Sequence, residues 1–427
     1  MNTIRLTRLL SAVIIFATCL FQAYSAEKYT PLPPAFDGSM MPYDFAACTQ
    51  IPYMPDSLTP VYAAYVARHG ARYLSSPKKM KSVMDALAKA RNNGQLSETG
   101  EDFLIFMNLI NTANDGNWGD LTPIGIKEER LLGRRMFETM NVLSHPDTRI
   151  SAISSYVPRA VMTMYQFSNQ LIRLNDRMSV ATDEGPGFSP LLCCFTADSA
   201  YAAYRKDGDW KYVYDDFVRR KVSPDPARRL FTSTDLSEHE LQKLTLDMYE
   251  ILKANRAAGL PAPTTRWMSV NEYQLCWEAS NLQHYLRNSV TPLSTTAARA
   301  TSPLLRRIID DTDKALGSSA NPEPAVHGYF GHAETLLPLL SLIKIPGCFD
   351  MPLDYDNLDS CWKIQNITPL GANLLILVAR APSGEYYVAV QLNGRTVQPM
   401  KGYPDLVKWP DLRQYWLDLI DAYANVK

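Results

Sequence analysis

Apolar and polar positions divide the chain into segments with strand-like and helix-like spacing. Residues 61–67, VYAAYVA, form a short apolar run that predicts a buried strand, and this strand ends at the basic sequence RHGAR, residues 68–72. Residues 77–97 and 101–114 carry apolar side chains at helical spacing, so they predict two amphipathic helices. Thr122, which is followed by a proline, predicts the N-cap of a third and longer helix.

Two further segments repeat this order of strand and helix. Residues 148–157 predict a second strand that ends in serines, and a helix is expected from about 158 to 174. Residues 325–343 predict a strand that runs directly into a helix. Near the end of the chain, residues 373–399 predict a β-meander with a hairpin turn at Asn393-Gly394.

The part of the chain between these segments has a different character. Prolines and aromatic residues increase, and the periodic stretches indicate helices at 237–259, 269–286 and 294–317. Strands therefore flank a mostly helical block in sequence. This order predicts an α/β fold with a mixed central sheet flanked by helices. The α/β core would comprise residues 26–182 and 303–427. A mostly helical insertion domain, residues 183–302, would interrupt this core and form a cleft with it.

The first 25 residues have the pattern of a secretory signal peptide. Arg5 and Arg8 precede an apolar run, and small residues follow up to Ala26. The apolar run is shorter than the ~20 residues that a membrane span needs. We therefore expect export to the periplasm or the medium, with no stable membrane anchor.

Overall charge excludes some partners. The chain has 43 basic and 44 acidic residues, for a formal net charge of −1. The only charged side chains in the signal peptide are those of Arg5 and Arg8, so its cleavage makes the net charge more negative. A surface of this kind does not attract nucleic acid or an anionic membrane. If the protein binds an anion, we expect a small molecule in a local pocket.

The cysteine count bears on the redox environment. Without Cys19, six cysteines remain, and an even number in an exported chain predicts disulfides. Cys193 and Cys194 are adjacent, and a bridge between neighbours is strained. Each is therefore expected to pair elsewhere, or one of them stays free.

Three segments place ionisable residues at predicted strand ends. They are Arg68-His69-Gly70-Ala71-Arg72, then Arg159, and then His332-Ala333-Glu334. In α/β sheets, ligands bind beyond the carboxyl ends of strands. Arginine matches phosphate oxygens with a rigid fork of donors, so the three segments together could surround a phosphoryl group.

Within such a cluster, a neutral His69 could attack phosphorus through one ring nitrogen while the other nitrogen donates to a fixed acceptor. Glu334 could protonate the departing ester oxygen and then activate water in the second step. The pH optimum is expected on the acid side. Ala71, as a small residue, is expected to leave room at the mouth of the pocket.

Other basic residues have simpler interpretations. His145, His239 and His284 lie in no partner motif, and His327 is expected to pack in the core. The basic runs at 219–221 and 228–229 could bind further phosphates of a substrate, although a solvated helix face is the more common explanation.

The motifs resemble those of the branch-2 histidine phosphatases, which include histidine acid phosphatases and phytases. RHGAR is similar to the family's signature, and LTPIGIKEERLLGRRM and SSYVPRAVMTMYQF resemble the blocks that follow it. Most members have a His-Asp pair at the third site. FGHAETLLPLLSLI has His-Ala-Glu instead, which resembles the multiple inositol-polyphosphate phosphatases.

The resemblance implies a role for each site residue. His69 would be the nucleophile and Glu334 the proton donor, and the phosphate would be held by Arg68, Arg72, Arg159 and His332. It also implies no metal and no cofactor, since arginines supply the positive charge that magnesium supplies elsewhere. The family usually has proline two residues after the second arginine, where this chain has Leu74.

The sequence thus predicts an exported phosphomonoesterase that acts on phytate and lower inositol polyphosphates through a phosphohistidine. A broad-specificity acid phosphatase or a sugar-phosphatase is an alternative within the same class. A phosphate-binding protein without catalysis is an alternative from another class.

Overall fold

The protein is described here by a computed structural model, which describes residues 29–46, 54–317, 323–349, 352 and 354–424. The chain divides into two compact units. Unit 1 comprises residues up to 41, 73–119 and 217–279, and unit 2 comprises residues 42–72, 120–216 and 280 to the end. Among the residues described, no helix has both the length and the apolar character needed to cross a bilayer.

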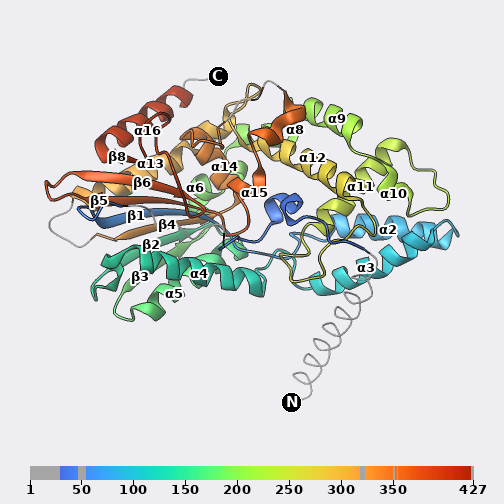
Figure 1. The fold of residues 1–427 in the computed structure, drawn as a ribbon, viewed down its shortest axis with the longest axis horizontal. Helices are drawn as coiled ribbons and strands as arrows, with labels where there is room; N and C mark the ends of the chain where they lie inside the picture. The colour runs from blue at the N-terminus through green and yellow to red at the C-terminus, as the bar shows by residue number, and fades with distance from the viewer. Residues whose placement is uncertain (1–28, 47–53, 318–322, 350–351, 353, 425–427) are drawn as a thin grey trace, which may run out of the picture. The chain divides into compact units, whose positions relative to one another are not determined.

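Unit 2 is built on one mixed sheet of eight strands (Figure 1). The strands are β1 (Thr59–Arg68), β2 (Arg149–Ser154), β3 (Ser179–Glu184), β4 (Val326–Gly331), β5 (Asn373–Arg380), β6 (Tyr386–Leu392), β7 (Arg395–Val397) and β8 (Leu406–Lys408). The order is β3-β2-β4-β1-β5-β6-β7, and β8 also pairs with β6. The strands from β3 to β1 are parallel, whereas β5 and the strands beyond it pair antiparallel.

Helices cover both faces of this sheet, with α4 and α5 on one face and α13, α14 and α16 on the other (Figure 1). Their bounds are α4 (Pro123–Thr139), α5 (Pro158–Leu174), α13 (Thr296–Gly317), α14 (Ala333–Leu342) and α16 (Trp409–Ala424). Shorter pieces of unit 2 are η2 (Asn141–Ser144), η3 (Pro186–Phe188), α6 (Ser189–Leu192), α7 (Cys194–Ala197), α8 (Ser199–Asp207), η4 (Tyr355–Ser360) and α15 (Ile364–Ile367). Because both faces are covered, the central strands are buried on both sides.

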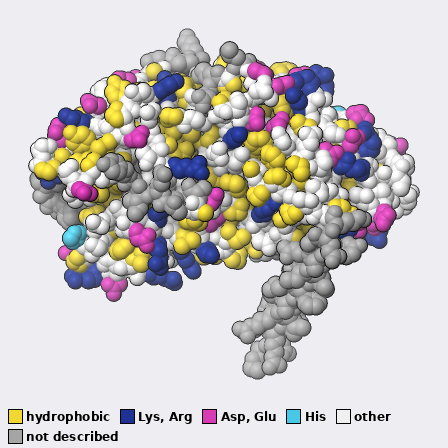
Figure 2. Space-filling model, in the orientation of Figure 1, with side chains coloured by type: hydrophobic (Ala, Val, Ile, Leu, Met, Phe, Trp, Pro, Cys, Tyr) yellow, Lys and Arg dark blue, Asp and Glu magenta, His cyan; other side chains and the backbone are white. Residues whose placement is uncertain are grey.

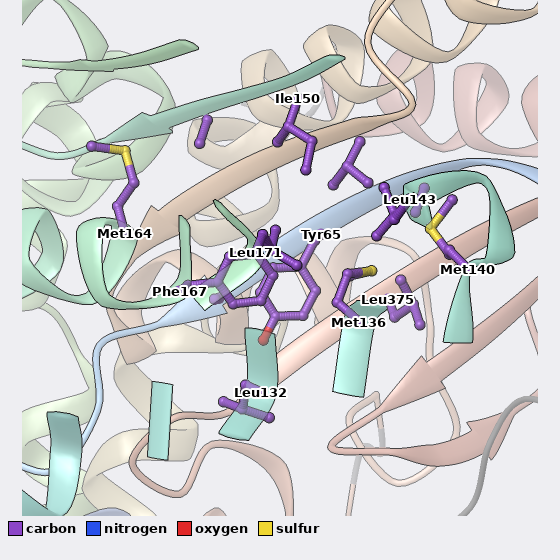
Figure 3. Close-up of a cluster of buried hydrophobic side chains, with 14 of the residues drawn as sticks. Tyr65, Leu132, Met136, Met140, Leu143, Ile150, Met164, Phe167, Leu171 and Leu375 are labelled. Carbon is purple, nitrogen blue, oxygen red and sulfur yellow. The ribbon is translucent and has the colours of Figure 1, made fainter. Parts of the chain in front are cut away.

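A large apolar cluster fills the space between the sheet and helices α4 and α5 (Figure 3). Tyr65 of β1 stacks on Phe167 of α5, with ring centroids 4.9 Å apart, and Phe167 also contacts Phe330 of β4. Leu132 and Met136 reach the same cluster from α4. Side chains from β1, β2, β4 and β5 thus fix the two helices, α4 and α5, that begin near the carboxyl ends of the parallel strands.

The other face of the sheet carries polar contacts at the alternate positions. The hydroxyl of Tyr329 donates to Asp311 Oδ2 of α13 at 2.7 Å, and Tyr62 Oη lies 3.1 Å from Nδ1 of His327. His327 is therefore packed in the sheet, as expected. The period of two along β1 and β4 sends successive side chains to opposite faces, so each helix layer has its own contacts.

Unit 1 is helical. It contains η1 (Pro34–Met40), α2 (Lys78–Asn92), α3 (Glu98–Asn114), α10 (Asp225–Arg228) and α11 (Glu238–Leu252). Helix α9 (Trp210–Lys221) begins in unit 2 and ends in unit 1, and α12 (Val270–Asn288) does the reverse. The buried carboxyl of Asp37 binds Arg256 and accepts from Tyr273 Oη at 2.7 Å. Burial raises the pKa of Asp37 to about 6, although Arg256 counteracts this effect.

The α/β fold with a mixed central sheet is confirmed. Thr122 is the N-cap of α4, and its hydroxyl accepts from Gly125 N at 3.2 Å. The β5–β6–β7 meander is also present, and its turn residues Asn393 and Gly394 have φ of 51° and 74°, as a type I′ turn requires. Strand β3 and helix α16 were not expected.

The domain boundaries expected from the sequence stay a prediction. The two compact units follow other boundaries, because residues 73–119 belong to unit 1 and residues 183–216 to unit 2. The expected signal peptide lies outside the described residues, as does Cys48.

The expectation of disulfides is wrong for three of the cysteines. Cys193, Cys194 and Cys276 are buried and carry free thiols. Burial raises the pKa of Cys193 to about 11 and that of Cys194 to about 12, so both thiols stay protonated and unreactive.

Candidate active site

The three predicted site segments meet at the carboxyl ends of neighbouring parallel strands. Strand β4 lies between β2 and β1, and its last residue, Gly331, is opposite Arg68 in the sheet. Ser154 at the end of β2 is opposite Phe330. The chain that follows each strand therefore leaves the sheet at the same edge, as expected for a ligand site in this fold.

Residues 68–72, called here the His69 loop, are fixed through their backbone. His69 N donates to Gly331 O at 3.1 Å, and His69 O accepts from Gly371 N at 3.0 Å. Ala71 N donates to Glu128 Oε2 at 2.7 Å, and Ala71 O accepts from Thr122 N at 2.9 Å. The loop is thus held by the end of β4, by the turn that precedes β5 and by the start of α4.

Glycines allow this loop to lie directly against α4. A Cβ on Gly70 would lie 2.9 Å from Glu129 Oε1 and 3.0 Å from Gly125 O. A Cβ on Gly125 would lie 2.2 Å from Ala71 O. The Gly125 contact excludes any side chain, and the Gly70 contacts are tight, so the close approach of the loop and the helix requires glycine at position 125 and favours it at position 70.

Beneath the loop lie two buried carboxyl groups of α4 with different partners. Glu128 accepts from the backbone N–H groups of Ala71 and Tyr43, whereas both oxygens of Glu129 lack a hydrogen-bond partner among the described residues. Burial, followed by the neighbouring Glu128, holds the pKa of Glu129 well above its ordinary value. Burial also raises the pKa of Glu128, but the N–H groups of Ala71 and Tyr43 oppose this effect, so Glu129 favours the neutral form more strongly.

The ring of His69 is buried and oriented. Its Nδ1 lies 3.0 Å from Gly70 O, and a carbonyl oxygen only accepts, so Nδ1 carries the proton and Nε2 has the lone pair. Burial, followed by Arg159, Arg68, Arg72 and His332, holds the pKa of His69 well below its ordinary value. The imidazole is consequently neutral.

Helix α5 brings two side chains to the site, one turn apart. Thr163 Oγ1 accepts from Gly70 N at 3.2 Å. Arg159 Nη2 lies 3.5 Å from His332 Nδ1, and the Nε2 of His332 lies 3.0 Å from Ser155 Oγ. The rings of His332 and His69 are 5.6 Å apart at their centroids. Burial, with Arg159 next, lowers the pKa of His332 to about 3.

Glu334 lies in the first turn of α14 and has a partner that the sequence did not indicate. Its Oε1 is 3.2 Å from Nη2 of Arg205, in α8. The Arg205 guanidinium also lies 5.1 Å from the centroid of the Phe195 ring, and this ring meets His332 edge-on at 5.5 Å. We call Glu334, Arg205, Phe195 and His332 the Glu334 cluster.

Charge at the site is strongly positive. Burial alone would raise the pKa of Glu334, but the guanidinium of Arg205, the largest opposing cause, holds it well below its ordinary value. Burial lowers the pKa of Arg68 to about 10, partly offset by Glu334. So many cations around one carboxylate are expected to bind an anion with several charges.

The structure thus brings together all six predicted site residues: Arg68, His69, Arg72, Arg159, His332 and Glu334. Sequence reasoning missed Thr163, Ser155, Phe195 and Arg205. Thr163 could have been found, because it lies four residues after Arg159 on the same helix face. No motif marks Arg205.

Ala71 was expected at the mouth of the pocket, and this expectation is wrong. The residue is fully buried, with 0% exposure, because its backbone is clamped between Glu128 and Thr122. Leu74, where proline is usual, uses the N–H that proline lacks. It donates to Asn114 Oδ1 at 2.9 Å within unit 1.

The basic run at 228–229 has partners in unit 1. Arg228 binds Asp225 and Glu238, and Arg229 Nη1 lies 2.9 Å from Glu272 Oε1. Both arginines are therefore surface ion-pair residues. On the face in Figure 2, acidic and basic side chains are interspersed, in keeping with a net charge near zero.

Comparison with known proteins agrees with this geometry. Residues 62–393 match the model of the histidine phosphatase superfamily, branch 2, and the chain belongs to this family. No curated protein matches the sequence.

Solved structures of low sequence identity share the fold. A multiple inositol polyphosphate phosphatase from Bifidobacterium longum, in complex with inositol hexasulfate, has a TM-score of 0.71 at 15% identity, over 90% of this chain and 97% of that chain. A phytase from D. castellii has a TM-score of 0.65 at 19% identity, with 91% and 85% covered. A Hafnia alvei phytase in complex with myo-inositol hexakis sulphate has a TM-score of 0.55 at 15% identity, with 88% and 100% covered.

Proposed function

We propose that the protein hydrolyses phosphate monoesters of phytate and lower inositol polyphosphates through a phosphohistidine on His69. The observation that carries this proposal is the orientation of the His69 ring. Nδ1–H donates to Gly70 O, so the Nε2 lone pair is available in a neutral imidazole surrounded by arginines.

In the first step, Nε2 of His69 attacks phosphorus and the bond from phosphorus to the ester oxygen breaks. The leaving alkoxide takes a proton from the Glu334 carboxyl group. In the second step, water attacks the phosphohistidine, Glu334 takes the proton from this water, and the P–N bond breaks to release phosphate and neutral His69.

Arg68, Arg72, Arg159 and His332 are proposed to hold the phosphoryl group. Arg68 is anchored through Nη1 to Thr368 O at 2.6 Å, and Arg159 reaches His332. Preorganised cations stabilise the charge that spreads over the phosphoryl oxygens during transfer. Because the backbone of the His69 loop is already fixed, little reorganisation is needed when the phosphate binds.

Inositol polyphosphates are proposed as the substrate class for two reasons. The site residues form a strongly cationic cluster, as a polyanion requires. The family match and the fold are shared with proteins described as a multiple inositol polyphosphate phosphatase and as phytases.

We also propose that the protein is exported. The support is the sequence of residues 1–25, with its basic start, apolar run and small residues. A disulfide that involves cysteines other than Cys193, Cys194 and Cys276 stays part of this proposal. Mass spectrometry of the mature protein would give both the first residue and the disulfides.

The function is tested by incubating the purified protein with phytate at pH 5 in the presence of a chelator and measuring released phosphate. We expect sequential release, with a ladder of inositol phosphates. No release from a folded protein would reject the proposal. Faster turnover of sugar phosphates or simple monoesters than of phytate would favour the broader acid phosphatase or sugar-phosphatase alternative.

A binding protein without catalysis is distinguished by comparing the wild-type protein with His69→Ala. A binding protein would take up phosphate in both forms and release none from phytate in either.

A further inference from the structure

The ion pair between Arg205 and Glu334 conflicts with the role of Glu334 as a proton donor. A donor must carry a proton before the ester bond breaks. In the structure, however, the guanidinium of Arg205 lies 3.2 Å from Glu334 Oε1, and the side chains of Arg205 and Glu334 are 12% and 29% exposed. A charge-assisted contact of this length favours the carboxylate form.

The surroundings of Glu334 add to this effect. The cations and histidines that face it come from four elements and from the junction of β4 and α14: Arg205, His284, Arg287, Arg159, Arg68 and His332. The remaining titratable neighbours are Tyr201, Cys193 and Cys194, which are neutral because burial raises the pKa of each. Two other acids act at the margin of this cluster: Asp198 interacts with Cys194, and Glu128 interacts with Arg68.

Arg205 is also placed to bind an anion. Its guanidinium is supported by the rings of Phe195 and Tyr201, at 5.1 and 5.8 Å. Burial, followed by repulsion from Arg205, lowers the pKa of Arg287, whose guanidinium lies 5.2 Å from the ring of Trp210. Two guanidiniums held by aromatic rings near a single carboxylate can bind one more multivalent anion.

We propose that Arg205 couples the binding of a second substrate phosphate to the protonation of Glu334. In the free protein, Arg205 holds Glu334 as a carboxylate. A polyphosphorylated substrate that occupies the His69 loop places another phosphate against Arg205 and Arg287. This phosphate binds the Arg205 guanidinium in place of the Glu334 carboxylate. The carboxylate then lies next to the negative charge of the phosphate, and it takes up a proton from solvent.

This inference rests on the proposed function and adds to it the reason for a polyphosphorylated substrate. A monoester with one phosphate fills only the place at the His69 loop and leaves the Arg205–Glu334 pair intact. The proton for the leaving group is then scarce, so hydrolysis is slow. Arg205 thus acts as a binding residue for one class of substrate and as a positioning residue for Glu334.

The first test compares Arg205→Gln with the wild type on glycerol 2-phosphate and on inositol hexakisphosphate, as pH profiles of kcat and KM. On glycerol 2-phosphate, we expect the high-pH limb of kcat/KM to move up by about one pH unit or more, because Glu334 loses its cation. On inositol hexakisphosphate, we expect KM to rise about 10-fold or more, because a charged partner of the substrate is lost.

The two substrates therefore respond in opposite directions near pH 6, which loss of structure alone would not produce. Arg205→Lys retains the charge and should keep the wild-type pH limb. Arg413→Gln removes an arginine from another ion pair of unit 2, with Asp313 at 2.7 Å, and should behave as the wild type. Parallel losses on both substrates with an unmoved pH limb would overturn the inference.

The second test measures proton uptake and does not depend on the Arg205 variant. Inositol hexasulfate carries no group that titrates near pH 5, so protons taken up when it binds belong to the protein. Calorimetry in buffers of different ionisation enthalpy should give about one more proton for the wild type than for Glu334→Gln. Inorganic sulfate should give no such difference. Equal uptake by the two proteins with hexasulfate would overturn the coupling.

Failure of the proposed function is separable from failure of this inference. Absence of phosphate release from inositol hexakisphosphate by the wild type rejects the function. Normal release, combined with equal proton uptake or parallel losses, rejects only the coupling through Arg205.

Discussion

The backbone holds the candidate site together around His69, whereas side chains hold it together around Glu334. In the His69 loop, the N–H and C=O groups of residues 69–71 are bonded to strand ends, α4, α5 and the His69 ring itself. In the Glu334 cluster, an ion pair and aromatic contacts make the equivalent connections. A part built from backbone bonds keeps one geometry, while a part built from side chains can exchange partners when a ligand arrives.

This difference also explains which part was visible in the sequence. Backbone bonding at close range requires glycine at defined positions, so the His69 loop and the start of α4 carry motifs. An arginine that reaches a carboxylate with its long side chain can start from many positions. Arg205 therefore belongs to no recognisable pattern.

The largest effect is expected at the nucleophile. His69→Ala removes the only group proposed to form a bond to phosphorus, and we expect kcat on phytate to fall by about 10⁴-fold or more. The measurement is phosphate release at saturating phytate. Phosphate binding should persist, since the arginines remain. Retention of more than a tenth of the activity would mean that another group is the nucleophile.

A smaller effect that depends on the leaving group is expected at the acid. Glu334→Gln cannot donate a proton, so kcat on inositol hexakisphosphate should fall by about 10²–10⁴-fold. Turnover of p-nitrophenyl phosphate should fall much less, because its leaving group needs no proton. The comparison is kcat for the two ester types in each variant. An equal loss on both types would argue against a donor role.

The rigid construction of the His69 loop is tested with Gly70→Ala. The new Cβ would lie 2.9 Å from Glu129 Oε1, the end of a side chain, and 3.0 Å from the Gly125 carbonyl, which belongs to the backbone of α4. We expect a loss of about 1–3 kcal/mol in the free energy of unfolding and a lower kcat.

Urea denaturation measures this loss, and Gly187→Ala is the matched control. Nothing lies within 4 Å of a Cβ at Gly187, so this substitution should leave both quantities unchanged. If Gly70→Ala behaved like Gly187→Ala, the loop would be more tolerant than its contacts indicate.

The smallest effect concerns stability rather than catalysis. The pKa of Glu129 is raised in the folded state, so the free energy of unfolding falls as pH rises from the ordinary pKa of a glutamate toward this raised value. The cost is about 1.4 kcal/mol for each pH unit in that window. The side chain of Glu129→Gln does not ionise, so its free energy of unfolding should not fall in this way as pH rises.

Chemical denaturation of both proteins from pH 4 to pH 8 checks the prediction. The wild type should lose stability relative to Glu129→Gln as pH increases. Parallel curves would mean that Glu129 has a partner that lets it ionise in the folded protein.

Much of the fold could be predicted because buried helices and strands show a clear periodic pattern of apolar residues. Helix α5 was predicted over its full observed length, and β1 and β4 were found from short apolar runs. Strand β3 was missed because it lies at the edge of the sheet and most of its side chains are partly or fully exposed. An edge strand of this kind has no continuous apolar run.

Helix α16 was missed although a signal was present. Its buried residues Trp409, Leu412, Trp416 and Leu419 repeat at helical spacing. The site was predictable where its residues lie directly at the end of a predicted strand, as Arg68 and His332 do. It was not predictable where the contact depends on the fold of residues 193–205, which approach the site from α7 and α8.

The position of β4 between β1 and β2 bears on when activity can appear during synthesis. Tyr62 and His327 touch across the sheet although 265 residues separate them in the chain. A ribosome must therefore complete most of the polypeptide before the central strand can enter its place. Until then, β1 and β2 lack the strand that lies between them. A nascent or truncated chain that ends before residue 326 would therefore be inactive and slow to fold.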